Sequence, residues 1–519
     1  MATPSEKLAE SLAILHRLQT TNGIAAIRTR DLTRTHRERL LKNGFLQEVM
    51  KGWYIPSRPD EVEGESTAWY ASFWKFAAAY LENRFRKNWS LSPEQSLSIY
   101  AGNWTVPRQL SVRSPKGTNT VTKLPHGTSF FDLKATLPQP ADRLETDGLR
   151  LYSLEAALIE ASPRYFVNHA TDARAALATI RDASYVLGRL LDGGHSTIAG
   201  RLAGAFRNIG RPSIADEVSA TMSAAGYAFR ESDPFSEQPV MAFLLRETSP
   251  YVNRIRVLWQ KMREPVLDLF PKAPGLASNA AAYMKGVEEA YLTDAYHSLS
   301  IEGYRVTLEL IERVRSGAWN PDANEQDREQ RNAMAARGYW QAFQLVERSI
   351  GRVLKSENPG GVAEEDHRAW YRDMFAPSVT AGLLKPGDLA GYRSGQVFIR
   401  NSMHVPLNKE AVRDAMPAFF DLLRAEEDPA VRVVLGHFIF VYIHPYMDGN
   451  GRVARFLMNT MMAAGGYPWT VIPLSERHVY MTALEKASVG EDIAPFAAFL
   501  AKLVRERLSG APLPAVPGR

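Results

Sequence analysis

The sequence contains no cysteine among its 519 residues. Disulfide bonds, thiolate catalysis and cysteine-bound zinc are therefore excluded, and any metal would be held by oxygen or imidazole ligands. It also has no stretch approaching the roughly 18 uninterrupted apolar residues that a membrane-spanning helix needs. The N-terminus, MATPSEKLAE, lacks the basic and then apolar pattern of a secretory signal. We therefore expect a cytoplasmic protein that does not contact a membrane.

A strong net charge is also absent, since the formal charge at pH 7 is only +5. This small excess is unevenly placed along the chain. Residues 1–60 hold ten Lys or Arg against six Asp or Glu, which gives this segment alone +4. Attraction to a polyanion such as DNA would therefore be centred on this segment.

The length predicts two to four domains, and residues 1–60 are the first candidate. They read as three helices and a short hairpin, with Thr29 and Thr35 placed to cap the second and third helices. This order resembles a winged helix-turn-helix, whose third helix would face a major groove. The candidate DNA-binding residues on that helix are His36, Arg37 and Arg39. A small helical domain with a solvated basic face is the alternative.

Residues 61–245 mix strand-like pieces with Ala-rich helical stretches, which predicts an α+β domain without a catalytic spacing. Leu97–Tyr100 and Gln109–Val112 are among the strand-like pieces. With the first segment, and on the pattern TRDL…LLKNGFL…KGWYIP, this region resembles the antitoxins of abortive-infection systems. The terminal APLPAVPGR predicts a disordered tail over residues 509–519.

The second half, residues 250–508, reads as helical almost throughout, so the protein is expected to be mainly α. Asp428-Pro429 is a favourable N-cap and first position for a buried central helix over Ala430–Ile443. The next helix begins near Gly451 and stops at Gly465-Gly466. The stretch between these helices is therefore a loop.

The backbone of this loop has the features of an anion site. Gly449 and Gly451 let neighbouring N–H groups turn towards one point at the start of a helix, whose dipole favours an anion. Arg452 and Arg455 lie three residues apart on one helix face, so both can reach phosphate oxygens.

Two further side chains of the loop suit phosphoryl chemistry. Asp448 offers one carboxylate beside the anion site, and Mg²⁺ is usually held by one or two carboxylates together with phosphates and water. His444 ends the buried helix and can accept a proton from an incoming hydroxyl at neutral pH.

Three other interpretations of the loop are weaker. A calcium loop counted from Asp448 would need Gly at the sixth position and Glu at the twelfth, where the sequence has Val453 and Asn459. A dinucleotide fingerprint needs a strand directly before its first glycine, but a helix-length apolar run and a short loop precede it here. An ordinary Asp-Gly turn would not require the histidine and both arginines at their positions.

The segment HPYMDGNGRVAR resembles the signature of the Fic family, His-x-Phe-x-Asp/Glu-Gly-Asn-Gly-Arg-x-x-Arg, with Tyr446 in place of the usual Phe. The added hydroxyl needs a buried partner. The resemblance implies an all-helical Fic domain with a β-hairpin flap, which transfers AMP from ATP, with Mg²⁺, to a Ser, Thr or Tyr hydroxyl of a protein. It implies His444 as general base, Asp448 as Mg²⁺ ligand, Gly449, Asn450 and Gly451 as phosphate cradle, Arg452 as a phosphate-binding residue and Arg455 as partner of the γ-phosphate. The kinase-like branch of the family has Lys at the position of Gly451.

A second motif resembles the family's inhibitory sequence, Ser/Thr-x-x-x-Glu-Gly/Asn. Ser298, Glu302 and Gly303 match it at the last turn of a predicted helix from about Ala281. A carboxylate at a helix C-terminus opposes the helix dipole, so we expect Glu302 to have a cationic partner, and we expect that partner to be Arg455. This pairing would divert the arginine from ATP. A solvated Glu near a helix end is the alternative.

Two short strands are predicted at Val397–Arg400 and Val405–Leu407, just before the loop. They resemble the family's flap, which holds an extended target segment by main-chain hydrogen bonds. A simple edge hairpin is the alternative.

Two rival functions remain open at this point. In one, residues 1–60 bind an operator as in a transcriptional regulator, and the Fic half senses nucleotide or modifies only itself. In the other, Glu302 positions a water molecule and the enzyme removes AMP from a modified protein.

Overall fold

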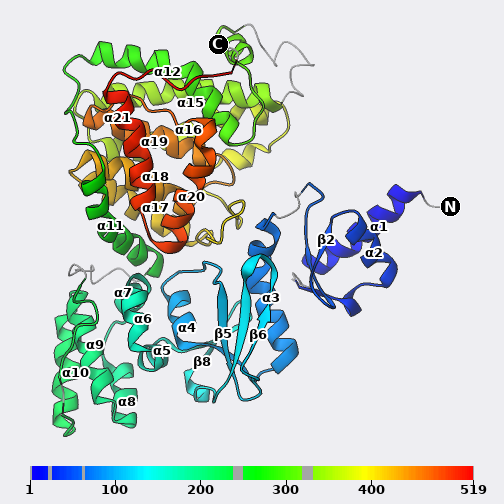
Figure 1. The fold of residues 1–519 in the computed structure, drawn as a ribbon, viewed down its shortest axis with the longest axis vertical. Helices are drawn as coiled ribbons and strands as arrows, with labels where there is room; N and C mark the ends of the chain where they lie inside the picture. Colours follow the sequence, from blue (N-terminus) through cyan, green and yellow to red (C-terminus); the bar gives the residue numbers. More distant parts are fainter. Residues whose placement is uncertain are drawn as a thin grey trace. The chain divides into compact units, whose positions relative to one another are not determined.

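The computed structural model describes residues 3–20, 26–60, 65–228, 230–237, 249–317 and 331–517 (Figure 1). The chain divides into two compact units. One holds Met1–Arg254 together with Phe398–Val405, and the other holds Ile255–Val397 together with Pro406–Arg519. The predicted boundary near residue 245 lies outside the described residues. No helix in these described ranges is long and apolar enough to cross a membrane.

The first unit begins with two helices and a three-stranded antiparallel sheet in the order β1-β3-β2. The elements are α1 (Pro4–Thr20), β1 (Ile27–Arg28), a 3-10 turn (Thr29–Asp31), α2 (Arg34–Lys42), β2 (Leu46–Met50) and β3 (Trp53–Pro56). Leu15, Ile27 and Leu40 are buried in a small shared core. Trp53 packs edge-on against Phe76 and Tyr80 of the next helix, so this segment also contacts the remainder of the first unit.

Two details of this segment differ from prediction. The second helix is only the 3-10 turn, and α2 is capped by Thr33 rather than by Thr35. Thr33 has an extended backbone and its side chain accepts a hydrogen bond from the His36 N–H at 3.4 Å. Thr35 already lies inside the first turn of α2, where a residue cannot act as the N-cap.

The rest of the first unit combines a mixed sheet with helices. The strand order is β4-β5-β7-β6, in which β5 and β7 are parallel, and β8 and β9 form a separate hairpin. The strands are β4 (Ser90–Leu91), β5 (Gln109–Ser114), β6 (Thr120–Lys123), β7 (Ser129–Lys134), β8 (Arg143–Thr146) and β9 (Leu149–Tyr152). The helices are α3 (Thr67–Phe85), α4 (Pro93–Tyr100), α5 (Leu154–Glu160), α6 (Pro163–Asn168), α7 (Ala170–Ala178), α8 (Ser184–Gly193), α9 (Ser196–Asn208) and α10 (Pro212–Ala224). The strand prediction at Leu97–Tyr100 is wrong, because Ser92 caps the Gln95 N–H and Pro93 starts a helix there.

The second unit is helical, as the fold prediction required. Its described helices are α11 (Pro250–Leu269), α12 (Ala280–Ile301), α13 (Leu308–Arg315), α15 (Arg331–Val353), α16 (Pro359–Thr380), α17 (Ala411–Ala425), α18 (Pro429–Ile443), α19 (Asn450–Gly465), α20 (Arg477–Gly490) and α21 (Ala494–Leu508). The first turn of α11, up to Arg254, still belongs to the first unit. The predicted central helix is α18, whose Asp428 cap accepts from the N–H groups of Ala430 and Val431 at 2.8 and 3.2 Å. Its side chains are buried almost all round, and it packs against α19 (Figure 1).

The two strands predicted at Val397–Leu407 do not form. The described residues between the 3-10 turn Pro386–Leu389 and α17 contain no strand. Pro406 has no N–H to donate to a ladder. The Gln396 Nε2 instead donates to the carbonyl oxygens of Val397 and Pro406, at 3.2 and 2.9 Å.

The tip of this segment belongs to the first unit. The Asn401 Oδ1 accepts from the Ser66 N–H at 3.1 Å, and the Val106 N–H donates to the Met403 carbonyl at 2.9 Å. The flap prediction assigns the backbone of this segment to holding an extended target. At its tip that backbone is already partly hydrogen-bonded within the first unit.

The C-terminal segment after α21 is described as far as residue 517. Its residues are exposed or half-buried except Val516, which is only 5% exposed. The backbone of Pro514 and Ala515 lies close enough to His297 of α12 to raise the pKa of that histidine, although burial lowers it more. Figure 1 shows this segment running alongside α12.

Candidate functional site

A histidine in a left-handed conformation ends α18 and begins the predicted active-site loop. His444 has φ 55° and ψ 61°, and its N–H donates to the Phe440 carbonyl at 3.0 Å. Its Nδ1 lies 3.1 Å from the Val441 carbonyl oxygen. A proton on Nδ1 makes this contact a hydrogen bond, and Nε2 is then the nitrogen that can accept a proton.

The surroundings of His444 keep its ring neutral. The pKa of His444 is lowered to about 4, chiefly by burial; Arg393 also lowers it, whereas the Val441 carbonyl, Glu302 and Asp448 raise it. The ring is therefore uncharged at pH 7, as a general base must be. Phosphate groups bound nearby would raise this pKa, because anions favour the charged imidazolium.

The side chain of Asn450 holds the loop closed. Its Oδ1 accepts from the Tyr446 N–H at 2.8 Å, and its Nδ2 donates to the Tyr446 carbonyl at 2.9 Å. Asn450 was predicted to line the phosphate cradle, but both of its side-chain groups are occupied by the loop itself. These two hydrogen bonds give the loop its shape, while the backbone N–H of Asn450 and the second hydrogen of its Nδ2 take no part in them.

Both glycines of the motif lie where an added Cβ would force a neighbouring side chain to move. A Cβ at Gly449, whose φ is +79°, would lie 2.7 Å from Phe375, and a Cβ at Gly451 would lie 2.4 Å from the Glu302 Oε1. Gly449 is also the N-cap of α19, and no side chain of the described residues caps that helix. The first N–H groups of α19 are thus left for an anion.

The Arg452 side chain is buried without enough hydrogen-bond acceptors for its N–H groups. It is 1% exposed and lies between the rings of Tyr304 and Phe375, with centroids at 5.2 and 4.9 Å. Among the described residues, its Nε and Nη2 have no hydrogen-bond partner, and the nearest carboxylate oxygen, on Asp448, is 3.4 Å from Nη2. Buried donors of this kind need an acceptor, and a phosphate would supply one.

The structure brings Arg455 together with the predicted inhibitory residues. Its Nη2 donates to the Glu302 Oε1 at 2.7 Å and to the Ser298 carbonyl at 3.1 Å, and its Nε donates to the Ser298 Oγ at 2.9 Å. Gly303, with φ +87°, follows the C-cap of α12. The expected pairing of Glu302 with Arg455 is therefore present.

Asp448 is the residue of the loop that suits a metal. Its side chain is exposed, and its Oδ1 accepts from the Gly449 N–H at 2.6 Å. The described residues contain no group of three or more His, Asp or Glu that could hold a metal on their own. A Mg²⁺ at this position would therefore need phosphate and water as its other ligands.

The model of the Fic/DOC family matches residues 362–462. These residues are a Fic/DOC family domain. The match runs from α16 to α19 and includes the loop described above.

Relatives of the Fic domain extend the match over about half of the chain. Protein adenylyltransferase Fic of Nematostella vectensis is 30% identical over 254 residues, which cover 48% of this chain and 55% of that protein. Protein adenylyltransferase fic-1 of Caenorhabditis elegans is 27% identical over 267 residues, covering 50% and 48%. A solved structure of C. elegans Fic-1 is 20% identical and covers 65% of this chain and 96% of that chain, with a TM-score of 0.37. The chain spans about half the length of the curated relatives it matches.

Several residues around the Fic loop carried no sequence signal. Tyr304 and Phe375, which enclose Arg452, come from segments far from the motif. Tyr446 stacks on Tyr371 with ring centroids 3.8 Å apart, and its buried hydroxyl has no hydrogen-bond partner among the described residues. Arg393 bonds to the His444 carbonyl at 2.8 Å. Tyr446 lies within the loop motif itself, and the buried partner expected for its added hydroxyl is not found among the described residues. Of the other residues, only Tyr304, directly after the inhibitory motif, lies near a recognisable pattern.

The candidate DNA-binding residues lie on α2, away from the Fic domain in sequence. The His36 Nδ1 and the Ser11 Oγ share a hydrogen bond of 3.0 Å, and the Arg39 Nη1 donates to the Lys7 carbonyl at 2.6 Å. Arg37 donates to the Thr29 carbonyl at 3.1 Å. These side chains bond to their own unit rather than extending into solvent.

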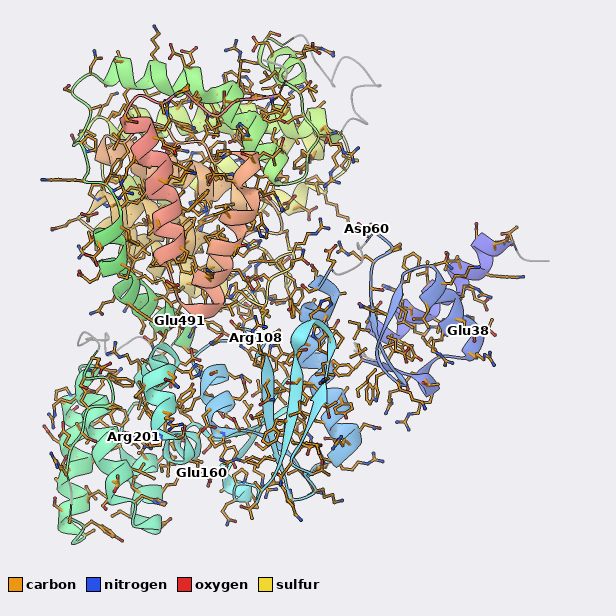
Figure 2. The ribbon with its side chains drawn as sticks, viewed as in Figure 1. Glu38, Asp60, Arg108, Glu160, Arg201 and Glu491 are labelled. Carbon is orange, nitrogen blue, oxygen red and sulfur yellow. The ribbon has the colours of Figure 1, made fainter. Side chains whose placement is uncertain are left out.

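The exposed face of α2 carries other residues. Glu38, labelled in Figure 2, lies on that face and pairs with Arg34 at 2.6 Å. Arg34 and Glu38 carry opposite charges, so this pair adds no net positive charge to that face.

Proposed function

We propose that this chain transfers AMP from ATP to a hydroxyl side chain of a protein target. The observation that carries the proposal is Arg452, which is buried yet has two donor nitrogens without a hydrogen-bond partner among the described residues, although Nη2 lies 3.4 Å from the Asp448 Oδ2. Phosphate oxygens beside Gly449 and Gly451 would satisfy them. The matched relatives from N. vectensis and C. elegans are named protein adenylyltransferases, which supports the same activity.

The proposed reaction places the phosphates of ATP at the N-terminus of α19. The Nε2 of His444 takes the proton of a target Ser, Thr or Tyr hydroxyl, and the hydroxyl oxygen bonds to the α-phosphorus. The bond from the α-phosphorus to its bridging oxygen then breaks, and pyrophosphate leaves. Mg²⁺ held by Asp448 and phosphate oxygens would neutralise the charge that develops on the leaving group.

The contact between Glu302 and Arg455 supports an autoinhibited resting state. Arg455 makes three hydrogen bonds to α12 and the residue that follows it through Nε and Nη2, so these two nitrogens are not available to the γ-phosphate in this arrangement. Only its Nη1 has no hydrogen-bond partner among the described residues. Removing the carboxylate frees the arginine and allows ATP to bind with its α-phosphorus near His444. The DNA-binding alternative gains nothing from His36 and Arg39, whose side chains bond to α1.

The test compares the parent protein with Glu302→Gly, Glu302→Gln and His444→Ala in the presence of Mg²⁺ and ATP labelled at the α-phosphate. The expected result is strong label on protein with Glu302→Gly, weaker label with the parent, and none when His444→Ala is added to Glu302→Gly. Glu302→Gln keeps the size of the side chain but removes its charge. An amount of label between those of the parent and of Glu302→Gly would therefore show that the inhibition depends on this charge.

Two outcomes would contradict the proposal. Label that persists without His444 would exclude this histidine as the base. Bound ATP without label in any variant, on the protein itself or on a lysate of the source cells, would indicate that the Fic domain only senses nucleotide.

A further inference from the structure

Arg393 is a buried arginine that neither sequence motif includes. It is 2% exposed, and each of its three side-chain nitrogens donates to a carbonyl oxygen. Nε donates to His444 at 2.8 Å, Nη1 to Gly395 at 2.9 Å, and Nη2 to Leu407. Its backbone N–H also donates to the Pro445 carbonyl at 2.9 Å. One residue therefore ties the first turn of the active-site loop to both ends of the segment 395–407.

These bonds fix the part of His444 that decides where its ring points. A non-glycine residue with φ near +55° is strained and persists only when its surroundings hold it there. The His444 carbonyl lies at the C-terminus of α18, where no further turn of the helix can supply a donor. The Arg393 guanidinium supplies that donor. Since the His444 Nδ1 is held by the Val441 carbonyl, the backbone position then determines the direction of Nε2.

The charge of Arg393 also faces the histidine. Burial lowers the pKa of Arg393 to about 10, with a smaller effect of the same sign from Arg413, so the guanidinium stays charged at pH 7. All of its hydrogen-bond acceptors among the described residues are neutral carbonyls. Burying a cation whose hydrogen-bond acceptors are all neutral costs more free energy than holding the loop with an uncharged donor would. Its field acts on His444 together with those of Glu302 and Asp448, which have the opposite sign.

We propose that Arg393 is a positioning residue for AMP transfer, which holds the His444 backbone and the two ends of segment 395–407 in one arrangement. The proposal rests on the transfer activity proposed above. Segment 395–407 covers the residues for which the sequence predicted a flap, and its two ends belong to the same unit as His444.

Arg413 provides a matched control for this proposal. It is a neighbouring arginine that also donates to carbonyl oxygens, those of Arg393 at 3.4 Å and Lys409 at 2.5 Å. Neither of these hydrogen bonds involves His444. Arg413→Gln therefore removes a neighbouring guanidinium, that of an exposed arginine on α17, while leaving the donor to the His444 carbonyl in place.

The kinetic experiment uses the full chain with Glu302→Gly, so that transfer is measurable, and adds Arg393→Gln, Arg393→Lys or Arg413→Gln. With Arg393→Gln we expect kcat to fall about 100-fold, the loss that a misplaced reacting group causes, while the Kd for ATP changes less than about 2-fold. Arg393→Lys keeps the charge but loses the fork of donors, so it should recover about 10-fold of that loss. Arg413→Gln should stay within about 3-fold of its background.

A second measurement does not depend on transfer. NMR titration of the histidine rings, with His444→Ala to assign the resonance, reports the pKa of His444 in the protein without ATP. Arg393→Gln should raise this pKa, Arg393→Lys should leave it near the parent value, and Arg413→Gln should shift it less. If Arg393→Gln does not fold, Arg393→Lys alone carries the test through its kcat at unchanged Tm.

The results separate the two proposals. Unchanged kcat together with an unchanged His444 resonance in folded Arg393→Gln would overturn the positioning role. A fall in kcat that matches the unfolded fraction, and that Arg413→Gln reproduces, would also overturn it. A shifted His444 resonance in a protein that transfers no AMP under any condition would support the positioning and refute the transfer.

Discussion

Helices α2 and α19 both begin with arginines in their first two turns, yet the structure uses them differently. In α2, the Thr33 side chain caps the His36 N–H, and Arg39 donates to carbonyl and hydroxyl oxygens of α1. In α19, the N-cap is Gly449, no side chain of the described residues caps the helix, and Arg452 keeps buried donors without partners. A cluster of arginines marks a ligand site only where the fold leaves the donors and the helix N-terminus open.

The largest expected effect is that of replacing Arg452, whose buried donors have no hydrogen-bond partner among the described residues. Arg452→Gln in the Glu302→Gly protein should lower transfer about 100- to 1000-fold, because one preorganised donor to the phosphates is lost. Arg39→Gln in the same background should change transfer less than about 2-fold, since it bonds only within its own unit. Labelling from α-labelled ATP measures both. Equal losses of AMP transfer in the two variants would contradict the distinction drawn between the arginines of α2 and those of α19.

A second prediction compares how each helix start is held. Asn450→Ala removes two hydrogen bonds to the Tyr446 backbone and leaves both groups buried without a partner. The free energy of unfolding should fall by about 2 to 4 kcal/mol. Thr33→Ala removes one cap from α2 and should cost about 1 kcal/mol. Urea unfolding of the two variants measures which substitution lowers the free energy of unfolding more. A smaller decrease for Asn450→Ala than for Thr33→Ala would contradict the role assigned to the Asn450 side chain.

The surroundings of Arg455 also include a buried acid, Asp294. Asp294 of α12 is 3% exposed and accepts a hydrogen bond from the Tyr339 hydroxyl at 2.5 Å. Burial raises the pKa of Asp294 to about 6, above the value of about 4 in an unfolded chain. The folded state thus binds this proton more tightly, so the stabilisation is complete below pH 4 and is lost as pH rises to 6.

The expected loss from Asp294 is about 2 to 3 kcal/mol between these two pH values. Asp294→Asn cannot titrate and should lack this contribution. The measurement is urea unfolding of the parent and of Asp294→Asn at pH 4.5, 5.5, 6.5 and 7.5, where the parent should lose stability relative to the variant up to pH about 6. Parallel curves would show that Asp294 is ionised throughout.

The sequence could predict the parts of the site that are local in the chain. The turn of glycines before α19 and the buried helix α18 follow from residues that are neighbours, so the motif predicts both position and chemistry. The pairing of Glu302 with Arg455 could be expected because the helix dipole demands a cation and the family resemblance suggests which one.

The rest depends on contacts between distant segments. Phe375 and Arg393 reach the loop from elsewhere, and no spacing in the sequence connects them to it. The strand prediction at Leu97–Tyr100 failed because its apolar pattern is short enough to fit a helix as well, and a cap and a proline decided between them. The role of Asn450 could not be predicted either, since an amide serves a phosphate and a loop backbone equally well.

The smallest effect concerns Arg39, and it tests the comparison from the side of α2. Arg39→Ala removes hydrogen bonds to the Lys7 carbonyl and the Ser11 hydroxyl, so the free energy of unfolding should fall by about 1 to 2 kcal/mol. Arg34→Ala is the control, because Arg34 is 82% exposed and forms only a surface ion pair with Glu38 among the described residues, so the free energy of unfolding should not change measurably. Thermal unfolding and salt-dependent binding to duplex DNA are measured on the same samples. If Arg39→Ala keeps the parent Tm and instead abolishes duplex binding, then Arg39 serves a ligand after all, and an arginine bonded to its own fold cannot be dismissed as a binding residue.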